Sequence, residues 1–146
     1  MLDLNLPKYD FKVKSEEGKK QIFDSVRKQF VALTPEEWVR QHFIHFLHQE
    51  KGFPLGLMGV EYPLQYNGMN KRADIICFQK EGKPMLLVEC KSANVSISQK
   101  VFNQIARYNF DLKVPYLVVT NGLQHFCCEM NYEENSYRFL EEIPVF

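Results

Sequence analysis

Hydrophobic residues recur at helical spacing in two stretches of the chain. The first stretch carries an apolar stripe that consists of Trp38, Val39, Phe43, Phe46 and Leu47. Thr34, Pro35 and Glu37 occupy the positions of an N-cap, a first helical residue and a capping-box acid, and Gly52 ends the stretch. A second amphipathic stretch runs from about residue 98 to residue 112. We therefore predict two helices.

Short apolar runs, each bounded by turn residues, predict β-strands between and after the helices. They cover residues 57–66, 73–79, 85–91, 116–120 and 123–129. The turn signals are Asn67-Gly68, with Asn70 and Lys71 continuing the loop, then Glu81-Gly82-Lys83-Pro84, and finally Asn121-Gly122. The continuous apolar residues of the second and third runs are typical of central strands that are buried on both faces.

The order of these elements predicts a mixed sheet. Three strands form a meander, and the passage from residue 91 through the second helix to residue 116 implies a crossover connection. We predict an α/β (mixed α+β) fold with a central mixed β-sheet flanked by helices, as a single domain over residues 1–146. Phe11 and Val13 indicate a short strand. Residues 22–30 fit either a strand or a helix, and so do residues 137–143.

Three charged residues lie at the ends of two predicted central strands. Asp74 lies near the start of one strand and Glu89 near the end of the next. If the Gly82 turn joins them as an antiparallel hairpin, the two positions lie opposite one another, and both carboxylates could bind one Mg²⁺ ion. Lys91 emerges on the same strand face as Glu89. A metal beside an ammonium group can activate water and stabilise charge on phosphorus, so the pattern indicates a metal-dependent phosphodiesterase. A surface salt bridge is the alternative.

Charge and hydropathy narrow the classes of protein that fit. Lys plus Arg number 18 and so do Asp plus Glu, so the net charge is zero and a whole-protein basic footprint for nucleic acid is missing. A local basic rim or a partner could still supply affinity for DNA. No apolar stretch approaches the ~20 residues of a membrane span, and the N-terminus has no signal-peptide pattern. We expect a cytoplasmic protein that does not bind a membrane.

Cysteine and histidine give no zinc signature. The four cysteines form no C-x-x-C pair, and we expect buried thiols in a reducing compartment. His42, His45 and His48 recur every three residues, a spacing that drifts around a helix, so at most two of them could share a metal.

Five segments together carry a resemblance to a known family. They are Pro35-Glu36-Glu37-Trp38-Val39-Arg40-Gln41, Lys71-Arg72-Ala73-Asp74, Val88-Glu89-Cys90-Lys91, Gln104-Ile105-Ala106-Arg107-Tyr108-Asn109 and Thr120-Asn121-Gly122. In combination they resemble the N-terminal nuclease domain of type I restriction enzyme R subunits (HsdR N-terminal-like), within the PD-(D/E)xK nuclease superfamily. The resemblance covers about residues 30–130.

The resemblance implies a restriction-endonuclease-like fold and hydrolysis of DNA phosphodiester bonds that depends on Mg²⁺ or Mn²⁺. Asp74, Glu89 and the main-chain carbonyl of Cys90 match the metal ligands, and Lys91 matches the catalytic lysine. The Gln-x-x-x-Tyr pattern at Gln104 and Tyr108 is similar to a motif that supports the site and its DNA contacts. An acid from the first helix completes many such sites. The candidates here are, in order, Glu37 and Glu36.

The sequence departs from the family pattern at two points. Ala73 stands where the motif name has Pro, and the chain has no G-x-x-x-x-G-K-[ST] phosphate loop. We therefore expect a nuclease domain without the motor, with an endonuclease favoured over an exonuclease. Helicase, translocase or methyltransferase subunits are possible partners beside DNA. Activity only within such a complex is one alternative, and a non-catalytic DNA- or protein-binding module is another.

Several residues near the motif have two readings. Glu37 could serve only as a capping residue of the first helix. Arg40 and Gln41 follow it by one helical turn and either orient it or lie on the surface. Glu61 faces either the site or solvent. Lys71 and Arg72 either contact a DNA phosphate or belong to a solvated loop.

Overall fold

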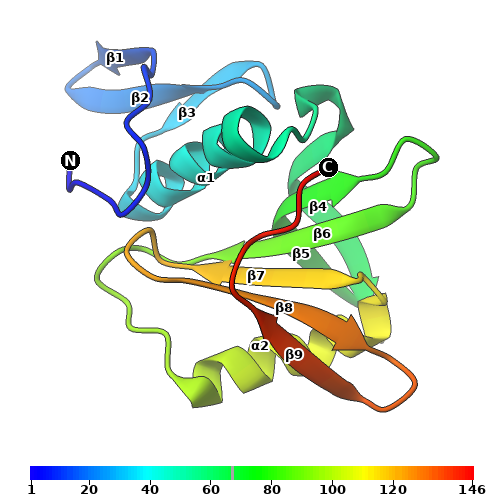
Figure 1. The fold of residues 1–146 in the computed structure, drawn as a ribbon. Coiled ribbons are helices and arrows are strands. Elements are labelled where there is room, and N and C mark those ends of the chain that lie inside the picture. The colour runs from blue at the N-terminus through cyan, green and yellow to red at the C-terminus, as the bar shows by residue number, and fades with distance from the viewer. Residues whose placement is uncertain (67) are drawn as a thin grey trace.

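The computed structural model describes residues 1–66 and 68–146, and it describes no side chain for Tyr66, Met69 or Tyr108. The elements are stacked in layers (Figure 1): a three-stranded sheet lies over helix α1, α1 lies on a six-stranded sheet, and helix α2 covers the other face of that sheet. The fold is therefore a mixed α+β fold with a central sheet flanked by helices, as the sequence predicts.

The three-stranded sheet is the part of the fold that the hydrophobic pattern of the sequence predicts least well. It contains β1 (Val13–Glu16), β2 (Lys19–Asp24) and β3 (Gln29–Ala32), joined as antiparallel neighbours in the order β1-β2-β3. The undecided segment 22–30 is therefore the end of one strand, a turn and the start of another. Only Ile22 and Asp24 of this sheet are buried, so its hydrophobic pattern is too weak to predict it.

Helix α1 (Pro35–Lys51) begins and ends where the capping residues predict. The Thr34 hydroxyl accepts the Glu37 N–H at 3.0 Å, and such a cap contributes about 1 kcal/mol to stability. Gly52 closes the helix with a φ of 79°, a left-handed conformation that glycine adopts without a Cβ penalty. The helix buries its apolar stripe on the central sheet.

The central sheet has the strand order β4-β5-β6-β7-β8-β9. Its strands are β4 (Met58–Tyr66), which follows the short 3₁₀ helix η1 (Leu55–Leu57), β5 (Met69–Phe78), β6 (Pro84–Cys90), β7 (Tyr116–Thr120), β8 (His125–Asn131) and β9 (Ser136–Leu140). Only β6 and β7 pair in parallel, and helix α2 (Gln99–Leu112) connects them. This is the predicted crossover in a mixed sheet.

The two faces of the central sheet form separate hydrophobic clusters. Val39 and Phe43 of α1 pack with Ile75 and Val88 on one face. Phe102 and Ile105 of α2 pack with Ile76, Leu87 and Leu117 on the other face. Alternating side chains of β5 and β6 therefore point into different clusters, which explains why these strands read as continuous apolar runs.

One expectation about strand boundaries was wrong, and one open alternative is decided. Asn70 and Lys71, expected in a loop, belong to β5, because the β4–β5 ladder continues to the pair Tyr66 and Met69. The segment 137–143, which fitted a helix or a strand, contains the end of strand β9. Of the expected Asn67-Gly68 turn, Asn67 lies outside the described residues.

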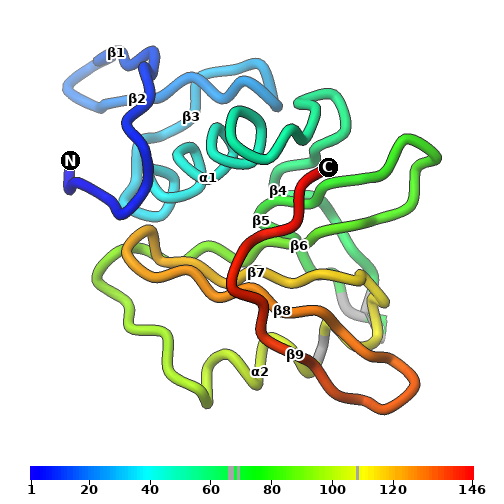
Figure 2. The backbone as a smooth tube through the Cα atoms, in the orientation of Figure 1, coloured from blue at the N-terminus to red at the C-terminus, as the bar shows by residue number. Residues whose placement is uncertain are grey.

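The chain ends are both tied to the body of the protein. Figure 2 shows the C-terminal segment crossing from β9 toward the end of α1, where the Phe146 N–H donates to the Lys51 carbonyl at 2.9 Å. The Asn5 N–H donates to the Gly122 carbonyl at 2.8 Å. Among the helices of the described residues, none has the length and apolar character needed to cross a membrane.

Candidate active site

The antiparallel hairpin of β5 and β6 brings Asp74 and Glu89 together. Ile75 pairs with Val88 and Ile76 with Leu87, so the register, continued by one residue, sets Asp74 opposite Glu89. The Cys90 N–H donates to Asp74 Oδ2 at 2.7 Å, which fixes one carboxylate against the neighbouring strand. The two carboxyl groups are close enough for one to hydrogen-bond the other when a proton is present. The register is the one that the Gly82 turn predicts.

Lys91 lies directly beyond this carboxyl pair. Its Nζ is 3.6 Å from Glu89 Oε1, and its side chain keeps about a third of its surface exposed. The Lys91 N–H donates to the Thr120 carbonyl of β7 at 2.8 Å, so the backbone here is held by the neighbouring strand. The ammonium group is therefore at the edge of the site, where it can meet a ligand from solvent.

Arg40 of α1 is the buried cation of the site. Only 6% of its surface is exposed. Its guanidinium contacts Glu37 through two hydrogen bonds of 2.6 and 2.9 Å, Glu61 at 2.5 Å and Asp74 at 3.1 Å. One arginine therefore holds acids from α1, β4 and β5. The sequence shows only the spacing of three residues between Glu37 and Arg40.

Glu61 joins the site from β4, on the far side of Asp74 from Glu89. Val60 pairs with Ile75 and Tyr62 with Ala73, so Glu61 lies opposite Asp74 in the register. Glu61 has a φ of 52°, which interrupts the extended backbone of β4 at this residue. Three acids from three neighbouring strands therefore stand in one row across the sheet. Glu61 faces the site, which answers the question that the sequence left open.

Further polar side chains connect this site to the three-stranded sheet. Arg27, in the β2–β3 turn, bonds both Asp24 at 2.7 Å and Glu37 at 3.0 Å. Gln41 donates to Asp24 and to Glu37, each at 3.0 Å. Asp24 and Gln41 are fully buried. The small sheet is thus fixed to the helix that carries Arg40.

The acids of the site differ in how readily they ionise. Burial and the nearby Asp74 carboxylate raise the pKa of Glu89 to about 7, although Lys91 acts in the opposite direction. Burial also raises the pKa of Asp74, against the lowering effect of the Cys90 N–H and Arg40. Burial alone would raise the pKa of Glu37, but hydrogen bonds from Arg40 and Gln41 lower it to about 2. Asp74 and Glu89 therefore form the pair whose pKa values stay raised, although Arg40 lies beside Asp74 and Lys91 beside Glu89.

The charges of these side chains limit which metal ion the site could bind. Among the described residues, His, Cys, Asp and Glu do not gather into a group of three or more that could hold a metal ion, so the dense ligand set of a structural zinc site is missing. Mg²⁺ requires less, since it keeps several waters and takes one or two carboxylates. Asp74 and Glu89 fit that requirement, and a cation between them would offset the burial that raises both pKa values and the repulsion from Asp74 that raises the pKa of Glu89 further.

The other predicted site residues have the following places. Glu36 is exposed at the start of α1 and near enough to raise the pKa of Asp74. Gln104 is exposed on α2, and within the described part of the chain no hydrogen bond joins it to the carboxyl pair. The side chain of Tyr108 lies outside the description. Arg72 is exposed and donates to the Glu61 carbonyl at 3.2 Å. The roles expected for Gln104, Tyr108 and Glu36 stay predictions.

In the metal-free protein, the free energy of unfolding is expected to fall as the pH rises from about 4.5 to about 7. Glu89 loses its proton near 4.5 when unfolded but near 7 when folded, so its proton stabilises the folded state below this window and is lost as the pH rises through it. The effect is at most about 3 kcal/mol. Urea unfolding at several pH values measures it. Glu89→Gln should flatten the profile, and an unchanged slope would contradict the assignment.

Fold and site together define a mixed α+β protein with a pair of facing carboxyl groups at the centre of its sheet, and the comparisons with known proteins give its family. Residues 35–144 match the family described as Type I restriction enzyme R protein N terminus (HSDR_N). The match covers most of the chain, and the chain belongs to this family. This confirms the resemblance found in the sequence. No curated protein matches the chain.

Two solved structures share the fold. One is a fragment of a candidate HsdR subunit of a type I restriction enzyme from Vibrio vulnificus YJ016, with a TM-score of 0.54 and 23% identity. The match covers 77% of this chain but only 24% of the HsdR fragment, which is much longer. The other is a candidate nuclease belonging to DUF820 from Anabaena variabilis ATCC 29413, with a TM-score of 0.50 and 12% identity over 96% of this chain and 84% of that one. At these identities the likeness establishes the fold.

Proposed function

We propose that this protein hydrolyses DNA phosphodiester bonds with Mg²⁺ or Mn²⁺ as cofactor, as an endonuclease. The observation that carries the proposal is the pair of carboxyl groups of Asp74, which is buried, and Glu89, which is half-buried, set opposite one another with the Lys91 ammonium 3.6 Å from Glu89. Membership of the R-subunit N-terminal family supports DNA as the substrate. It also supports other subunits of a restriction system as partners.

Each residue of the proposed active site would have its own role in the reaction. Asp74 and Glu89, with the main-chain carbonyl of Cys90, would hold the metal, and Glu37 remains the proposed additional acid. When bound, the metal would supply a Lewis acid for the phosphate and lower the pKa of a bound water. Lys91 would stabilise the extra negative charge on phosphorus or orient the attacking water. Arg40 keeps Asp74 in place through its 3.1 Å contact.

A non-catalytic DNA- or protein-binding module is the second candidate function. Arg40 favours it, since its guanidinium contacts Glu37, Glu61 and Asp74 and so offsets part of the negative charge that would attract a metal ion. The zero net charge points the same way, because phosphate binding draws on many Lys and Arg side chains. The two candidates differ in one measurable respect, which is turnover of DNA.

Replacing Lys91 with Met is expected to reduce cleavage by about 10²-fold or more, because the transition state loses its cationic partner. The experiment follows nicking of supercoiled plasmid with Mg²⁺ and with EDTA, for the wild type and for Lys91→Met. Lys113→Met is the matched control, since Lys113 is exposed at the end of α2. A wild-type chain that does not cleave DNA with Mg²⁺, alone or with added restriction subunits, would favour the non-catalytic module.

A further inference from the structure

The three-stranded sheet presents to solvent a face that the proposed reaction does not use. On its inner face Ile22 and Asp24 are buried against the body of the protein. On its outer face Phe23 and Phe30 are paired directly across β2 and β3, with ring centroids 5.3 Å apart. Both rings are half-buried although they point away from α1, so other side chains of the sheet must cover them.

Two lysines provide this cover. The Lys12 Nζ lies 5.6 Å from the centroid of the Phe23 ring, and the Lys14 Nζ lies 4.4 Å from the centroid of the Phe30 ring. Both lysines are exposed. An ammonium group over an aromatic ring is attracted to its π-face, while the methylene stem packs on apolar surface. We refer to Lys12, Lys14, Phe23 and Phe30 as the lysine face. Lys14 also lies 3.7 Å from Glu16, in an exposed ion pair that water screens, so both ammonium groups stay open to a ligand from solvent.

Positive charge is also concentrated in the segment that forms the three-stranded sheet. Residues 12–32 contain six Lys and Arg against three Asp and Glu, a net charge of +3. Since the whole chain is neutral, the remainder carries a net charge of −3. One of the three acids, Asp24, is buried and bonded to Arg27. Arg27 is taken up by this bond, so five Lys remain against two Glu and the net charge of the segment stays +3. A polyanion that approaches the protein is attracted here first.

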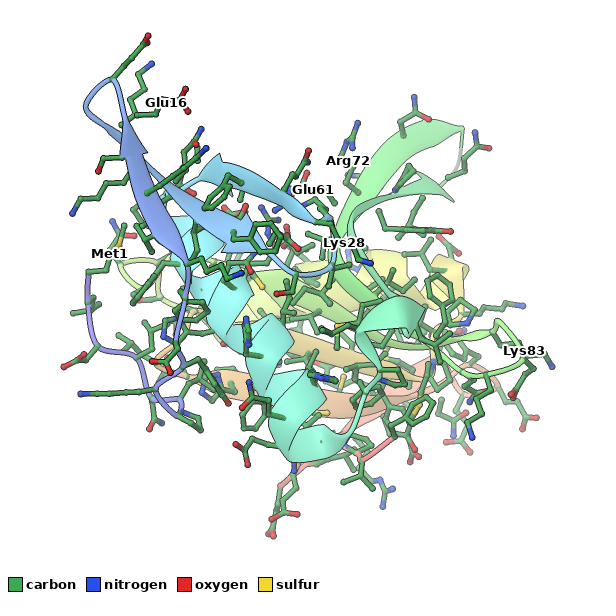
Figure 3. The ribbon with its side chains drawn as sticks, turned by 90° about the horizontal axis from the view of Figure 1, so that it is seen from above. Met1, Glu16, Lys28, Glu61, Arg72 and Lys83 are labelled. Carbon is green, nitrogen blue, oxygen red and sulfur yellow. The ribbon has the colours of Figure 1, made fainter. Side chains whose placement is uncertain are left out.

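The lysine face leads toward the carboxyl pair. In the view of Figure 3, Lys28, Glu61 and Arg72 appear on the same side of the molecule, with Glu16 at the far end of the three-stranded sheet and Lys83 on another side. Lys28 is in the β2–β3 turn, next to Arg27, which bonds Glu37.

We propose that the lysine face and Lys28 bind the phosphate backbone of DNA beside the site of Asp74 and Glu89. The inference rests on the proposed function for its choice of DNA. In this proposal, β1–β3 supply the affinity for DNA that the zero net charge of the whole chain does not provide. The lysine face contacts the backbone outside the cleaved bond, so it contributes affinity and position without sequence specificity.

The test compares two variants that lose the same charge. In the first, Lys12, Lys14 and Lys28 are replaced by Gln. In the control, Lys80, Lys83 and Lys113 are replaced by Gln; all of these are exposed lysines, and Lys28 and Lys113 share a φ of 56°. Binding of a short fluorescein-labelled duplex is measured by anisotropy in EDTA over a series of salt concentrations. Thermal unfolding of both variants checks that they are folded.

The first variant is expected to bind at least about tenfold more weakly than the wild type, and the slope of log K against log salt should flatten by about one unit per lost phosphate contact. The control should keep the wild-type affinity to within about twofold. Equal effects in both variants, no effect in the first, or no binding by the wild type would each overturn the inference. Plasmid cleavage with Mg²⁺ is scored separately. Loss of binding in the first variant together with a wild type that does not cleave supports the lysine face and rejects hydrolysis.

Discussion

Replacing Asp74 with Asn is expected to lower DNA cleavage by at least about 10³-fold and to leave the protein folded. Asn has nearly the same shape, and its carbonyl oxygen can still accept the Cys90 N–H that the aspartate accepts at 2.7 Å. It loses the negative charge that would hold the metal and that faces Arg40 at 3.1 Å. The loss of repulsion with Glu89 offsets part of the lost attraction, so the change in stability should be small compared with the change in rate.

Two measurements together check this result. Plasmid nicking with Mg²⁺ gives the loss of rate, and isothermal titration with Mn²⁺ shows whether the ion still binds. Asp111→Asn is the matched control, because Asp111 is exposed near the end of α2 and its replacement should change neither quantity. If Asp74→Asn cleaves DNA at the wild-type rate, the proposed mechanism is wrong. If neither the wild type nor the variant binds Mn²⁺, the non-catalytic module is the better description.

Replacing Arg40 with Met is expected to reduce the free energy of unfolding by about 3–5 kcal/mol at neutral pH. Met keeps most of the apolar volume, so the cost comes from charge. Glu37, Glu61 and Asp74 lose the cation that all three contact, and Glu37 and Asp74 are largely buried. A buried acid without its partner must either stay charged at high cost or take up a proton. Urea unfolding of the wild type and the variant measures the difference.

An arginine on the surface of the same protein supplies the control. Arg138 pairs with Glu129 at 2.7 Å, but their side chains are 72% and 41% exposed. Arg138→Met should therefore cost less than about 1 kcal/mol. Calcium should stabilise Arg40→Met more than it stabilises the wild type, because a divalent cation can take over part of the balancing role and binds the folded state. A cost for Arg40→Met no larger than that for Arg138→Met would show that the acids do not depend on Arg40.

The hairpin of the site could be predicted because its determinants are local. The Gly82 turn and the apolar runs on either side of it set the register, and the register sets Asp74 opposite Glu89. The helix boundaries are local for the same reason, since Thr34 and Gly52 cap α1 through bonds to its own backbone. The parallel pairing of β6 and β7 followed from the length and amphipathic character of the connection between them.

The remainder of the site depends on packing between distant elements. Arg40 could be seen to share a helix face with Glu37, but its burial and its contacts with Glu61 and Asp74 arise only when α1 docks on the sheet. The small sheet escaped prediction because β1 is exposed along its whole length. Its second turn also has no glycine at the left-handed position, which Lys28 occupies. The lysine face could not be predicted either, since its rings and ammonium groups come from segments that are separate in the sequence.

The conformation of Glu61 makes the shape of β4 depend on another element. A residue with a side chain in the left-handed region costs of order 1–3 kcal/mol, and the surrounding structure must offset this strain. Here the compensation is the 2.5 Å ion pair with Arg40 of α1. The backbone of one strand therefore stores energy that a helix holds in place. The conformation of β4 at Glu61 is therefore tied to the position of α1.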